Sequence, residues 1–430
     1  MNKLKKVFRR RCSLIPFQGL GVFLLLFFPI IIFGQSMTLE NCQEKAKANY
    51  PLIKQYGLIE QTLQYNISNA NKGYLPQLSL SARASYQSDA ISINLNVVQM
   101  GQDKDQYQAV LEASQLIWDG GVISAQKQIS KASIEMDKQK LEVEIFNLNE
   151  RVNQLFFGIL LLDEQIKQTE ILQNELEVNF KRVVSFKQNG VANQSDIDAI
   201  KVEQINANQR YTELRSTQKS YKIMLGALIG MPLKEELVKP EMSLIVLSDT
   251  TNNRPELKLF DVQKSLFDSQ KDLLNAANLP KIGIFGQVGY GKPGLNMLYN
   301  GFSDFYLGGV RLSWNFSGLY TQKNNINKLE LNKKMVDVQK ETFLFNTDLK
   351  TKQQQTEIEK LQQILLNDDE IISLRGSIKT ASNAKLENGT LTVSDLIRDI
   401  NAENVAKQSK SLHEIQLLMA VYQLKNNINK

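Results

Sequence analysis

Apolar residues recur at alternating intervals of four and three residues through one long stretch of the chain. From Val122 to Gln188 there is no proline, and Gly158 is the single glycine. The repeating positions are Leu141, Ile145, Leu148, Val152, Leu155, Ile159, Leu162 and Ile166, continued in phase by Leu176, Phe180 and Val183. Such spacing buries a narrow stripe against neighbouring helices, as in a coiled coil. At 1.5 Å per residue, the stretch predicts a helix of about 67 residues, near 100 Å long.

A second segment of the same kind runs from Tyr320 to Asn388, with Gly376 as its interior glycine. Its apolar positions keep a similar phase with gaps, at Ile358, Leu361, Leu365 and Ile372. Because this stripe is less regular, its packing is predicted to be less like a coiled coil.

Both long segments end at a predicted reversal. Asn189-Gly190 and Asn388-Gly389 can take the positive φ that closes a helix. Ser195-Asp196 and Ser394-Asp395 follow, and each pair is predicted to cap a returning helix with a side-chain oxygen on exposed amides. The returning helices are expected over about 196–229 and 395–427. Helices expected at about 38–72 and 255–276 would stack end to end with them and match the long partners.

Four shorter segments alternate apolar and polar residues with a period of two. Pro76 and Pro280 precede the first and third of them. The apolar positions are Leu78, Leu80, Ala82, Ala84 and Tyr86; Tyr107, Ala109, Leu111 and Ala113; Ile282, Ile284, Val288 and Tyr290; Tyr306, Val310, Leu312 and Trp314. This alternation predicts a sheet with one wet and one apolar face. A soluble four-stranded sheet packed on helices fits the pattern as well as membrane-crossing strands do.

Two details favour a membrane barrel over the soluble sheet. Trp118 and Trp314 end the outgoing strands, where interfacial aromatics gather in membrane barrels. The expected hairpin loops, 88–104 and 291–303, are polar or rich in Gly and Asn. Four strands cannot close a barrel, since open edges leave unpaired amides in hydrocarbon. Three chains would supply twelve strands, so the barrel reading requires a homotrimer.

The chain also repeats itself. Leu75-Pro76-Gln77-Leu78 returns as Leu279-Pro280-Lys281-Ile282, and Leu116-Ile117-Trp118-Asp119 returns as Leu312-Ser313-Trp314-Asn315. An internal duplication is therefore predicted, each copy being helix, strand, strand, long helix and returning helix. The expected units are a first repeat over 35–230, a linker region over 231–254 and a second repeat over 255–430.

Residues 1–34 have the pattern of a secretory signal peptide, with a basic start, an apolar run and the small Gly34. An uncleaved membrane anchor is the alternative. The whole chain carries a net charge of +6. The six basic residues of the leader account for it, so the remaining chain is near neutral and gives no support for nucleic-acid binding. Cys42 would be the single cysteine left after cleavage and could not form an internal disulfide.

The pattern resembles the TolC-like outer membrane efflux proteins (outer membrane factors) over nearly all of the exported chain. The supporting residues are Met37-Thr38-Leu39-Glu40, Gly73-Tyr74-Leu75-Pro76-Gln77-Leu78-Ser79-Leu80 and Trp118-Asp119-Gly120-Gly121. The resemblance implies a mainly α fold with a small β part: an antiparallel α-helical coiled-coil barrel in the periplasm and four transmembrane strands per chain. It implies a homotrimer whose twelve strands close a barrel in the cell outer membrane.

The resemblance also implies which residues form the periplasmic tip, where such channels close and meet an adaptor. One reversal contributes Gly190, Val191, Ser195 and Asp196, and the other contributes Gly389, Thr390, Leu391, Ser394 and Asp395. In well-known members an acidic residue recurs one turn later, where this chain has Arg398. A mixed Asp395/Arg398 ring would pair charges and weaken a preference for cations.

By the same resemblance, the expected partners are two sister chains, a periplasmic adaptor protein, an inner-membrane pump and outer-membrane lipid. The predicted function is passive conduction in a tripartite efflux pump or a type I secretion system. Neither a cofactor nor a metal is implied. The alternative from the residues alone is an exported coiled-coil scaffold with a soluble sheet.

Enzymatic chemistry finds little support in the sequence. His413 is the single histidine and falls in a predicted helix, so no Ser–His–acid order is compelling. No cluster has metal-ligand spacing. Gly286 to Lys292 mimics a phosphate loop, but Pro293 stands where a metal-binding Ser or Thr is needed. An envelope hydrolase is therefore disfavoured.

Overall fold

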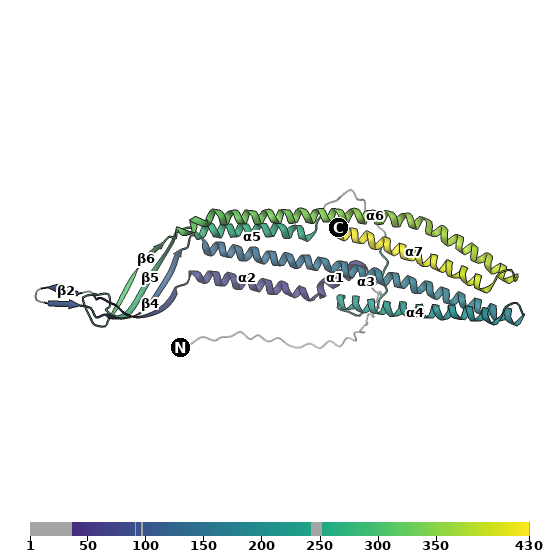
Figure 1. Cartoon of the computed structure of the whole chain (residues 1–430), viewed down its shortest axis with the longest axis horizontal. Coiled ribbons are helices and arrows are strands. Elements are labelled where there is room, and N and C mark those ends of the chain that lie inside the picture. Colours follow the sequence, from purple (N-terminus) through teal and green to yellow (C-terminus); the bar gives the residue numbers. More distant parts are fainter. Residues whose placement is uncertain (1–36, 91, 96–97, 242–251, 430) are drawn as a thin grey trace, which may run out of the picture.

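We analysed the protein through a computed structural model, which describes residues 37–90, 92–95, 98–241 and 252–429. The molecule is elongated, with a small sheet at one end and long helices running to the other (Figure 1). The expected leader, 1–34, and most of the second half of the expected linker lie outside the described residues.

The described helices and strands occur in the same order in each half of the chain, but the first half has one extra hairpin and two helices, α1 and α2, where the second half has α5. The helices are α1 (Leu39–Asn49), α2 (Gln55–Asn71), α3 (Val122–Gln188), α4 (Gln194–Ile229), α5 (Pro255–Ala277), α6 (Ser317–Glu387) and α7 (Val393–Ile428). The strands are β1 (Gln77–Tyr86), β2 (Ser92–Leu95), β3 (Val98–Gly101), β4 (Asp105–Trp118), β5 (Lys281–Lys292) and β6 (Ser303–Ser313). Two short 3-10 segments are η1 (Pro51–Lys54) and η2 (Lys72–Tyr74).

Helix α3 has the bounds that its proline-free run predicts, Val122–Gln188. It starts after Gly121, which lies in the left-handed region at φ 89°. The buried Asp119 carboxylate fixes this start, accepting hydrogen bonds from the Gly121 amide at 2.9 Å and the Ile123 amide at 2.6 Å. A carboxylate at this position also complements the positive end of the helix dipole.

The segment expected as one helix over 38–72 is interrupted. Helix α1 ends at Asn49, and Pro51 opens the 3-10 segment η1 before α2 begins at Gln55. Proline has no amide hydrogen to continue the α-helical ladder, and it restricts the residue before it, so the break falls where Pro51 stands.

The short helices lie end to end and match the long ones, as expected (Figure 1). At one junction the Asn49 side-chain amide donates to the carbonyls of Ala227 and Leu228, at 3.2 and 3.0 Å. At the other, the Asn253 amide donates to the carbonyl of Ile428 at 3.2 Å. These bonds satisfy the last carbonyls of α4 and α7, which have no partners within their own helices.

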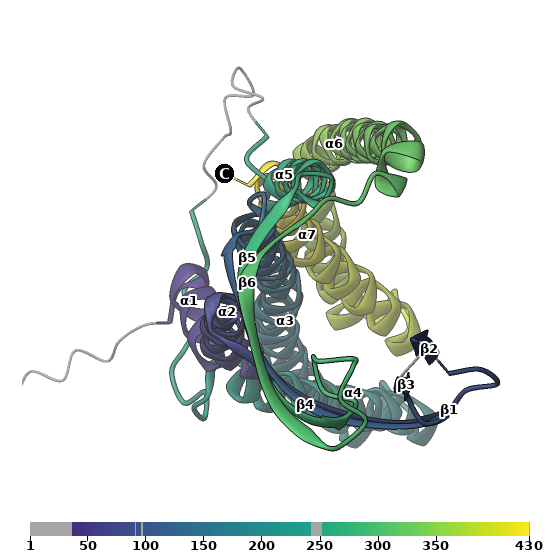
Figure 2. The ribbon, with the colours of Figure 1, turned by 90° about the vertical axis from the view of Figure 1, so that its left-hand side faces the viewer.

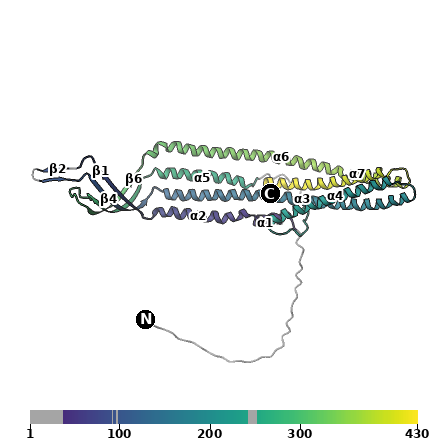
Figure 3. The same cartoon turned by 60° about the horizontal axis from the view of Figure 1, so that its bottom comes forward.

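Near the sheet, α2, α3, α5 and α6 lie side by side in that order (Figure 3). Towards the far end, α4, α3, α7 and α6 form the corresponding row. Helix α3 is interior in both rows, and α6 is at an edge in both. The largest apolar core lies where α1, α3, α4 and α7 meet, with Phe156 and Phe157 almost fully buried.

The four main strands form one antiparallel sheet in the order β1-β4-β5-β6, so β4 and β5 join the two halves of the chain. Figure 2 shows this sheet bent into an arc. Strands β1 and β6 are its edges, and among the described residues each pairs with one other strand. Strand β1 follows α2 and β6 leads into α6, so the sheet edges continue into the edge helices.

Strands β2 and β3 form a separate hairpin beyond the sheet, inside the loop expected over 88–104. This hairpin was not predicted from the sequence. Ser92–Leu95 alternates in only four residues, which is too short for the period to stand out from a polar loop.

Candidate functional site

The two helix reversals lie together at the end of the molecule opposite the sheet (Figure 1). Gly190 and Gly389 have φ of 72° and 69°, the left-handed conformation that closes each helix. In each reversal an amide past the glycine bonds back to the last helical turn: Val191 to the carbonyl of Phe186 and Thr390 to that of Lys385, both at 2.9 Å. The two halves of the chain therefore build the same turn twice.

The returning helices are capped differently from the prediction. The N-cap residues are Asn193 and Thr392, whose side chains accept from the amides of Asp196 and Asp395 at 3.1 Å each. Asp196 completes a capping box by accepting from the Asn193 amide at 2.9 Å. The prediction that Ser195-Asp196 and Ser394-Asp395 cap these helices was wrong, and the two aspartates lie in the first turn as partners of the caps.

Ser195 and Ser394 are exposed within the first turn of their helices and are not the caps. The missed signal was the spacing of Asn193 to Asp196 and of Thr392 to Asp395. A cap residue followed three positions later by an acid is the pattern of a capping box.

An apolar cluster joins the two reversals. Its buried members come from both hairpins, and Val183, Ile200, Leu396 and Ile400 are almost fully buried. Leu391 and Ala192, one from each turn, pack against it. Val191 is not a member of this cluster and is 59% exposed. The two turns thus form one packed end that leaves an apolar side chain open to solvent.

Arg398 pairs with the acid one turn before it on α7. Its guanidinium lies 3.0 Å from the Asp395 carboxylate and 4.0 Å from that of Asp399. The Thr392 hydroxyl, which donates to Asp395 at 2.7 Å, and then Arg398 lower the pKa of Asp395. The charge at this turn is therefore mixed within a single chain.

A cluster of ion pairs lies further along the helices from the turns and joins three of them. Lys379 of α6 bonds to Glu175 of α3 at 2.8 Å and to Glu403 of α7. Lys407 bonds to Glu403 at 2.8 Å. Burial opposes the charge on Lys379, but its two carboxylate partners outweigh burial and raise its pKa. Burial likewise opposes the charge on Glu403, yet its two lysines lower its pKa.

Nearer the turns, Arg182 of α3 reaches α6, donating to Asn383 at 2.8 Å and lying 3.9 Å from Glu387. Neither polar link could be predicted from the sequence, because their members are far apart in the chain and no short motif joins them. Together they tie the α6–α7 hairpin to α3 beside the turns.

At the opposite end, the register separates the sheet residues onto two faces. Leu80 pairs with Leu111, Leu111 with Val288 and Val288 with Tyr306, so the four form one row across the sheet. These side chains are 76%, 48%, 60% and 84% exposed, in that order. The apolar face is therefore continuous and uncovered in a single chain.

The other face is polar and carries glycines under aromatic rings. Glu112 accepts from Gln287 at 2.7 Å and from Arg311 at 3.1 Å. The Arg311 guanidinium stacks over the Phe285 ring at 4.5 Å. Phe305 covers Gly289, where a Cβ would lie 2.3 Å from the ring.

Trp118 and Trp314 lie where the strands meet the helices, on the apolar side by register and alternation. Trp118 is the last residue of β4 and pairs with Ile282, while Trp314 directly follows β6. They are 43% and 50% exposed. The Trp314 indole donates to the carbonyl of Asn278 at 3.0 Å, which fixes its polar edge on the helix side.

His413 accepts or donates a 2.7 Å hydrogen bond with Asp368, between α7 and α6. Neighbouring Asp369 bonds to Lys410 at 2.5 Å. Cys42 is fully buried in the central core, and burial raises its pKa to about 11. Within the described ranges, no three His, Cys, Asp or Glu side chains group as a metal ion would require.

In the part of the chain that the structure describes, no helix is both long and apolar enough to cross a membrane.

Residues 43–231 match the family model of outer membrane efflux proteins. No curated protein sequence gives a significant match.

Several solved structures share the fold at low sequence identity. The outer membrane protein VceC from Vibrio cholerae is 12% identical with a TM-score of 0.66, covering 91% of this chain and 95% of its own. The Campylobacter jejuni CmeC outer membrane channel is 14% identical with a TM-score of 0.64, covering 91% and 85%. The Neisseria gonorrhoeae MtrE outer membrane channel, solved in its open state, is 13% identical with a TM-score of 0.63, covering 91% and 88%.

Proposed function

We propose that this chain is a TolC-like outer membrane efflux protein and one third of a trimeric export channel. The family match over residues 43–231 and the shared fold support this proposal. It lies in the outer membrane with its helices extending into the periplasm. Its work is passive conduction and not bond chemistry. In this proposal the energy comes from an inner-membrane pump, reached through a periplasmic adaptor, in a tripartite efflux or type I secretion assembly.

The sheet is the observation that carries the proposal. It presents an uncovered apolar face, and among the described residues its edge strands β1 and β6 each pair with one other strand. Lipid would cover the apolar face, but an open edge in lipid leaves backbone groups unpaired at several kcal/mol each. Pairing β6 of one copy with β1 of the next removes both edges, and three copies give a twelve-stranded barrel.

The helices support the same arrangement. Because β6 leads into α6 and β1 follows α2, pairing these strands sets α6 of one copy beside α2 of the next. Helix α6 has an exposed apolar seam at coiled-coil spacing, formed by Leu331, Met335, Val338, Phe345 and Leu349. Helix α2 has no buried residue, and its Leu58 and Tyr65 are 61% and 69% exposed. Each edge thus offers the other an apolar stripe.

The packed end with the two turns is the proposed periplasmic gate and adaptor contact. Its residues are Gly190, Val191, Ser195, Asp196, Gly389, Thr390, Leu391, Ser394, Asp395 and Arg398. Opening moves the α6–α7 hairpin away from α3, which requires the Lys379 and Arg182 links to break or re-form. The Asp395–Arg398 pair leaves the gate a weaker cation preference than an acidic ring would have.

The test is a matched pair of lysine substitutions on β6. Val310 is on the apolar face and 72% exposed, whereas Leu307 is on the polar face and 44% exposed. Val310→Lys would place a charge in hydrocarbon at a cost of about 2–4 kcal/mol, while Leu307→Lys would meet water in the pore. We expect Val310→Lys alone to lower the amount of membrane-inserted trimer and of exported toxic compounds.

The measurements are native mass spectrometry of detergent extracts and compound accumulation in cells. A protein that washes from membranes without detergent, or that extracts as a single chain, would contradict the trimeric barrel. It would favour an exported scaffold with a soluble sheet. If both lysine variants lost trimer and export equally, the two faces of the sheet would not be in contact with lipid on one side and water on the other.

A further inference from the structure

The charges within the four main strands are sorted by face. Arg83, Glu112, Lys281 and Arg311 are on the polar face, by their register with Gln108, Gln287, Ser313 and Gly283 respectively. Asp105, Lys292 and Asp304 are on the other face, at the end of the sheet farthest from the helices. The polar face therefore has three cations and one anion per chain.

The single acid on this face is already engaged. Glu112 accepts from both Gln287 and Arg311, and its side chain is 22% exposed. This leaves Arg83 and Lys281, for which no ion pair is found among the described residues. Arg83 is exposed and Lys281 is half-buried. The uncompensated charge on the polar face is thus +2 per chain.

The sheet is hollowed on the same face, close to the helices. A hollow of about 300 Å³ is lined by Lys281, Arg311, Phe285, Gly283, Gln77 and Ser114, which belong to all four strands. Arg311 is held in place here from two sides, by Glu112 and by the Phe285 ring. The hollow is an open concavity whose wall combines two cations, amide groups and an aromatic ring.

We infer that the inner wall of the barrel favours anionic cargo, with Lys281, beside the Glu112-paired Arg311, forming a cationic ring near the helices and Arg83 a second one nearer the outer mouth. This inference rests on the proposed trimeric channel, in which each position occurs three times around the pore. Rings of Arg and Lys favour anions in other pores. The cargo class is a compound bearing a carboxylate, sulfonate or phosphate group.

The expected strength of the effect follows from the pore width. A twelve-stranded barrel is wider than the eight-stranded barrels that side chains fill, and narrower than porins. Wall charges act over about 10 Å at 0.1 M salt and about 3 Å at 1 M salt. Anion preference should therefore be clear in dilute salt and nearly absent in concentrated salt.

The experiment is the reversal potential of the purified trimer in a planar bilayer under a KCl gradient. Arg83→Gln and Lys281→Gln should each lower the chloride-to-potassium permeability ratio, by roughly twofold in dilute salt. Lys292→Gln is the control, because it removes a positive charge from the opposite face of β5, where Lys292 is paired with Asp103 at 2.5 Å and Asp105 at 3.7 Å. It should leave the ratio unchanged.

The outcomes separate the two proposals. A pore whose ion preference is the same in wild type, Arg83→Gln and Lys281→Gln would overturn the inference and leave the channel standing. A reconstituted trimer that conducts no ions would overturn both. In cells, the two variants should retain more of an anionic dye and no more of a cationic dye of equal size. Equal retention of both dyes would also contradict the inference.

Discussion

Helices α3 and α6 occupy corresponding places in the two halves of the chain but are stabilised in different ways. Of the 67 residues of α3, twenty are buried, most of them apolar, whereas seven of the 71 residues of α6 are buried and four of those are polar. Helix α3 packs against partners on both sides. Helix α6 packs against α5 and α7 on one side, and its remaining apolar seam is uncovered.

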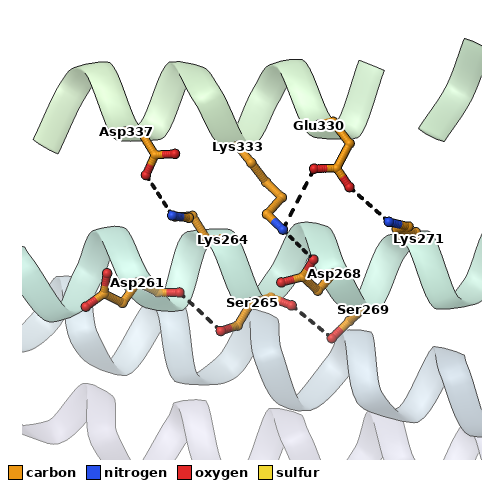
Figure 4. A network of polar contacts seen from close by, with 9 residues as sticks. All are labelled: Asp261, Lys264, Ser265, Asp268, Ser269, Lys271, Glu330, Lys333 and Asp337. Carbon is orange, nitrogen blue, oxygen red and sulfur yellow. Dashed lines mark hydrogen bonds and ion pairs between the residues drawn. The ribbon is translucent and has the colours of Figure 1, made fainter. Parts of the chain in front are cut away.

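A ladder of ion pairs joins α6 to α5 (Figure 4), beside a contact between the rings of Phe260 and Phe343. Lys264 bonds to Asp337 at 2.7 Å, Lys271 to Glu330 at 2.9 Å and Lys333 to Asp268 at 2.7 Å. Exposed ion pairs contribute little stability, so this ladder sets alignment more than it holds the helices together. The comparison shows that a long helix can bury its apolar residues within one chain, as α3 does, or can depend on a neighbouring chain to cover them, as α6 does.

The largest effect should come from the α3 core. Phe156 is fully buried in the central cluster, so Phe156→Ala removes its packing and leaves a cavity at a cost of about 3–5 kcal/mol. We expect a large fall in the melting temperature of the detergent-solubilised protein. Val178→Ala on the same helix is the control, since Val178 is 58% exposed and lies outside the proposed contact between copies.

Next in size is the seam of α6. Phe345→Asp would place a charge at the proposed contact with α2 of the next copy, and we expect the trimer to dissociate while the fold of each chain persists. Native mass spectrometry reports the oligomer, and circular dichroism reports helix content. The control Gln339→Asp adds the same charge at an exposed α6 residue outside the four–three spacing of the seam. A stable Phe345→Asp trimer would show that the seam faces solvent.

The sequence predicted α3 more fully than α6 because the two burial patterns differ in kind. The four–three spacing of α3 indicates locally that each turn packs against a neighbouring helix. The bounds of the helix follow from the residues that flank it. The gaps in the α6 stripe correctly indicated weaker coiled-coil packing. They did not indicate Leu331, Met335 and Val338, since these residues have no partner within the chain that would single them out.

At the candidate site, sequence located the turns but not the links beside them. The Asn-Gly pairs and the aspartates determine the conformation of the turns locally. The positive φ of Gly190 and Gly389 could therefore be predicted from the sequence. Lys379, Glu175 and Glu403 come from three helices far apart in the chain. Only the three-dimensional arrangement brings them together, and lysines and glutamates are too frequent on helix surfaces to be distinguished beforehand.

A third, intermediate effect is expected at this cluster. Lys379→Met removes the shared partner of Glu175 and Glu403 and leaves the largely buried Glu403 with Lys407 alone. We expect this to lower the free energy of unfolding by about 1–3 kcal/mol. We expect a lower melting temperature and, because this link ties α6 to α3, a more readily opened channel with higher conductance. Unchanged conductance with lowered stability would mean that the cluster does not restrain the gate.

The same cluster predicts that its contribution to stability depends on pH. The pKa of Glu403 is lowered from 4.5, so its contribution is present above that value and is lost as pH falls through the lowered pKa. The pKa of Lys379 is raised from 10.5, so its contribution is present below that value and is lost as pH rises beyond it. The difference in melting temperature between wild type and Lys379→Met should be greatest at pH values between the pKa of Glu403 and the pKa of Lys379. It should shrink at pH values outside that range. A difference that is constant with pH would contradict the ionic origin.

The smallest effect is expected in the α5–α6 ladder. Lys333 contacts Asp268 and also lies 4.0 Å from Glu330, but these carboxylates are substantially exposed (Figure 4). Lys333→Gln should therefore lower the melting temperature by under about 2 °C, and the difference should vanish at 1 M salt, where screening acts within about 3 Å. Lys379→Gln, in a less exposed cluster of the same helix, is the matched comparison and should keep most of its effect in salt. If Lys333→Gln were instead as damaging as Lys379→Gln, the ladder would be a principal support of α6, and the helix would depend less on a neighbouring chain than its exposed seam implies.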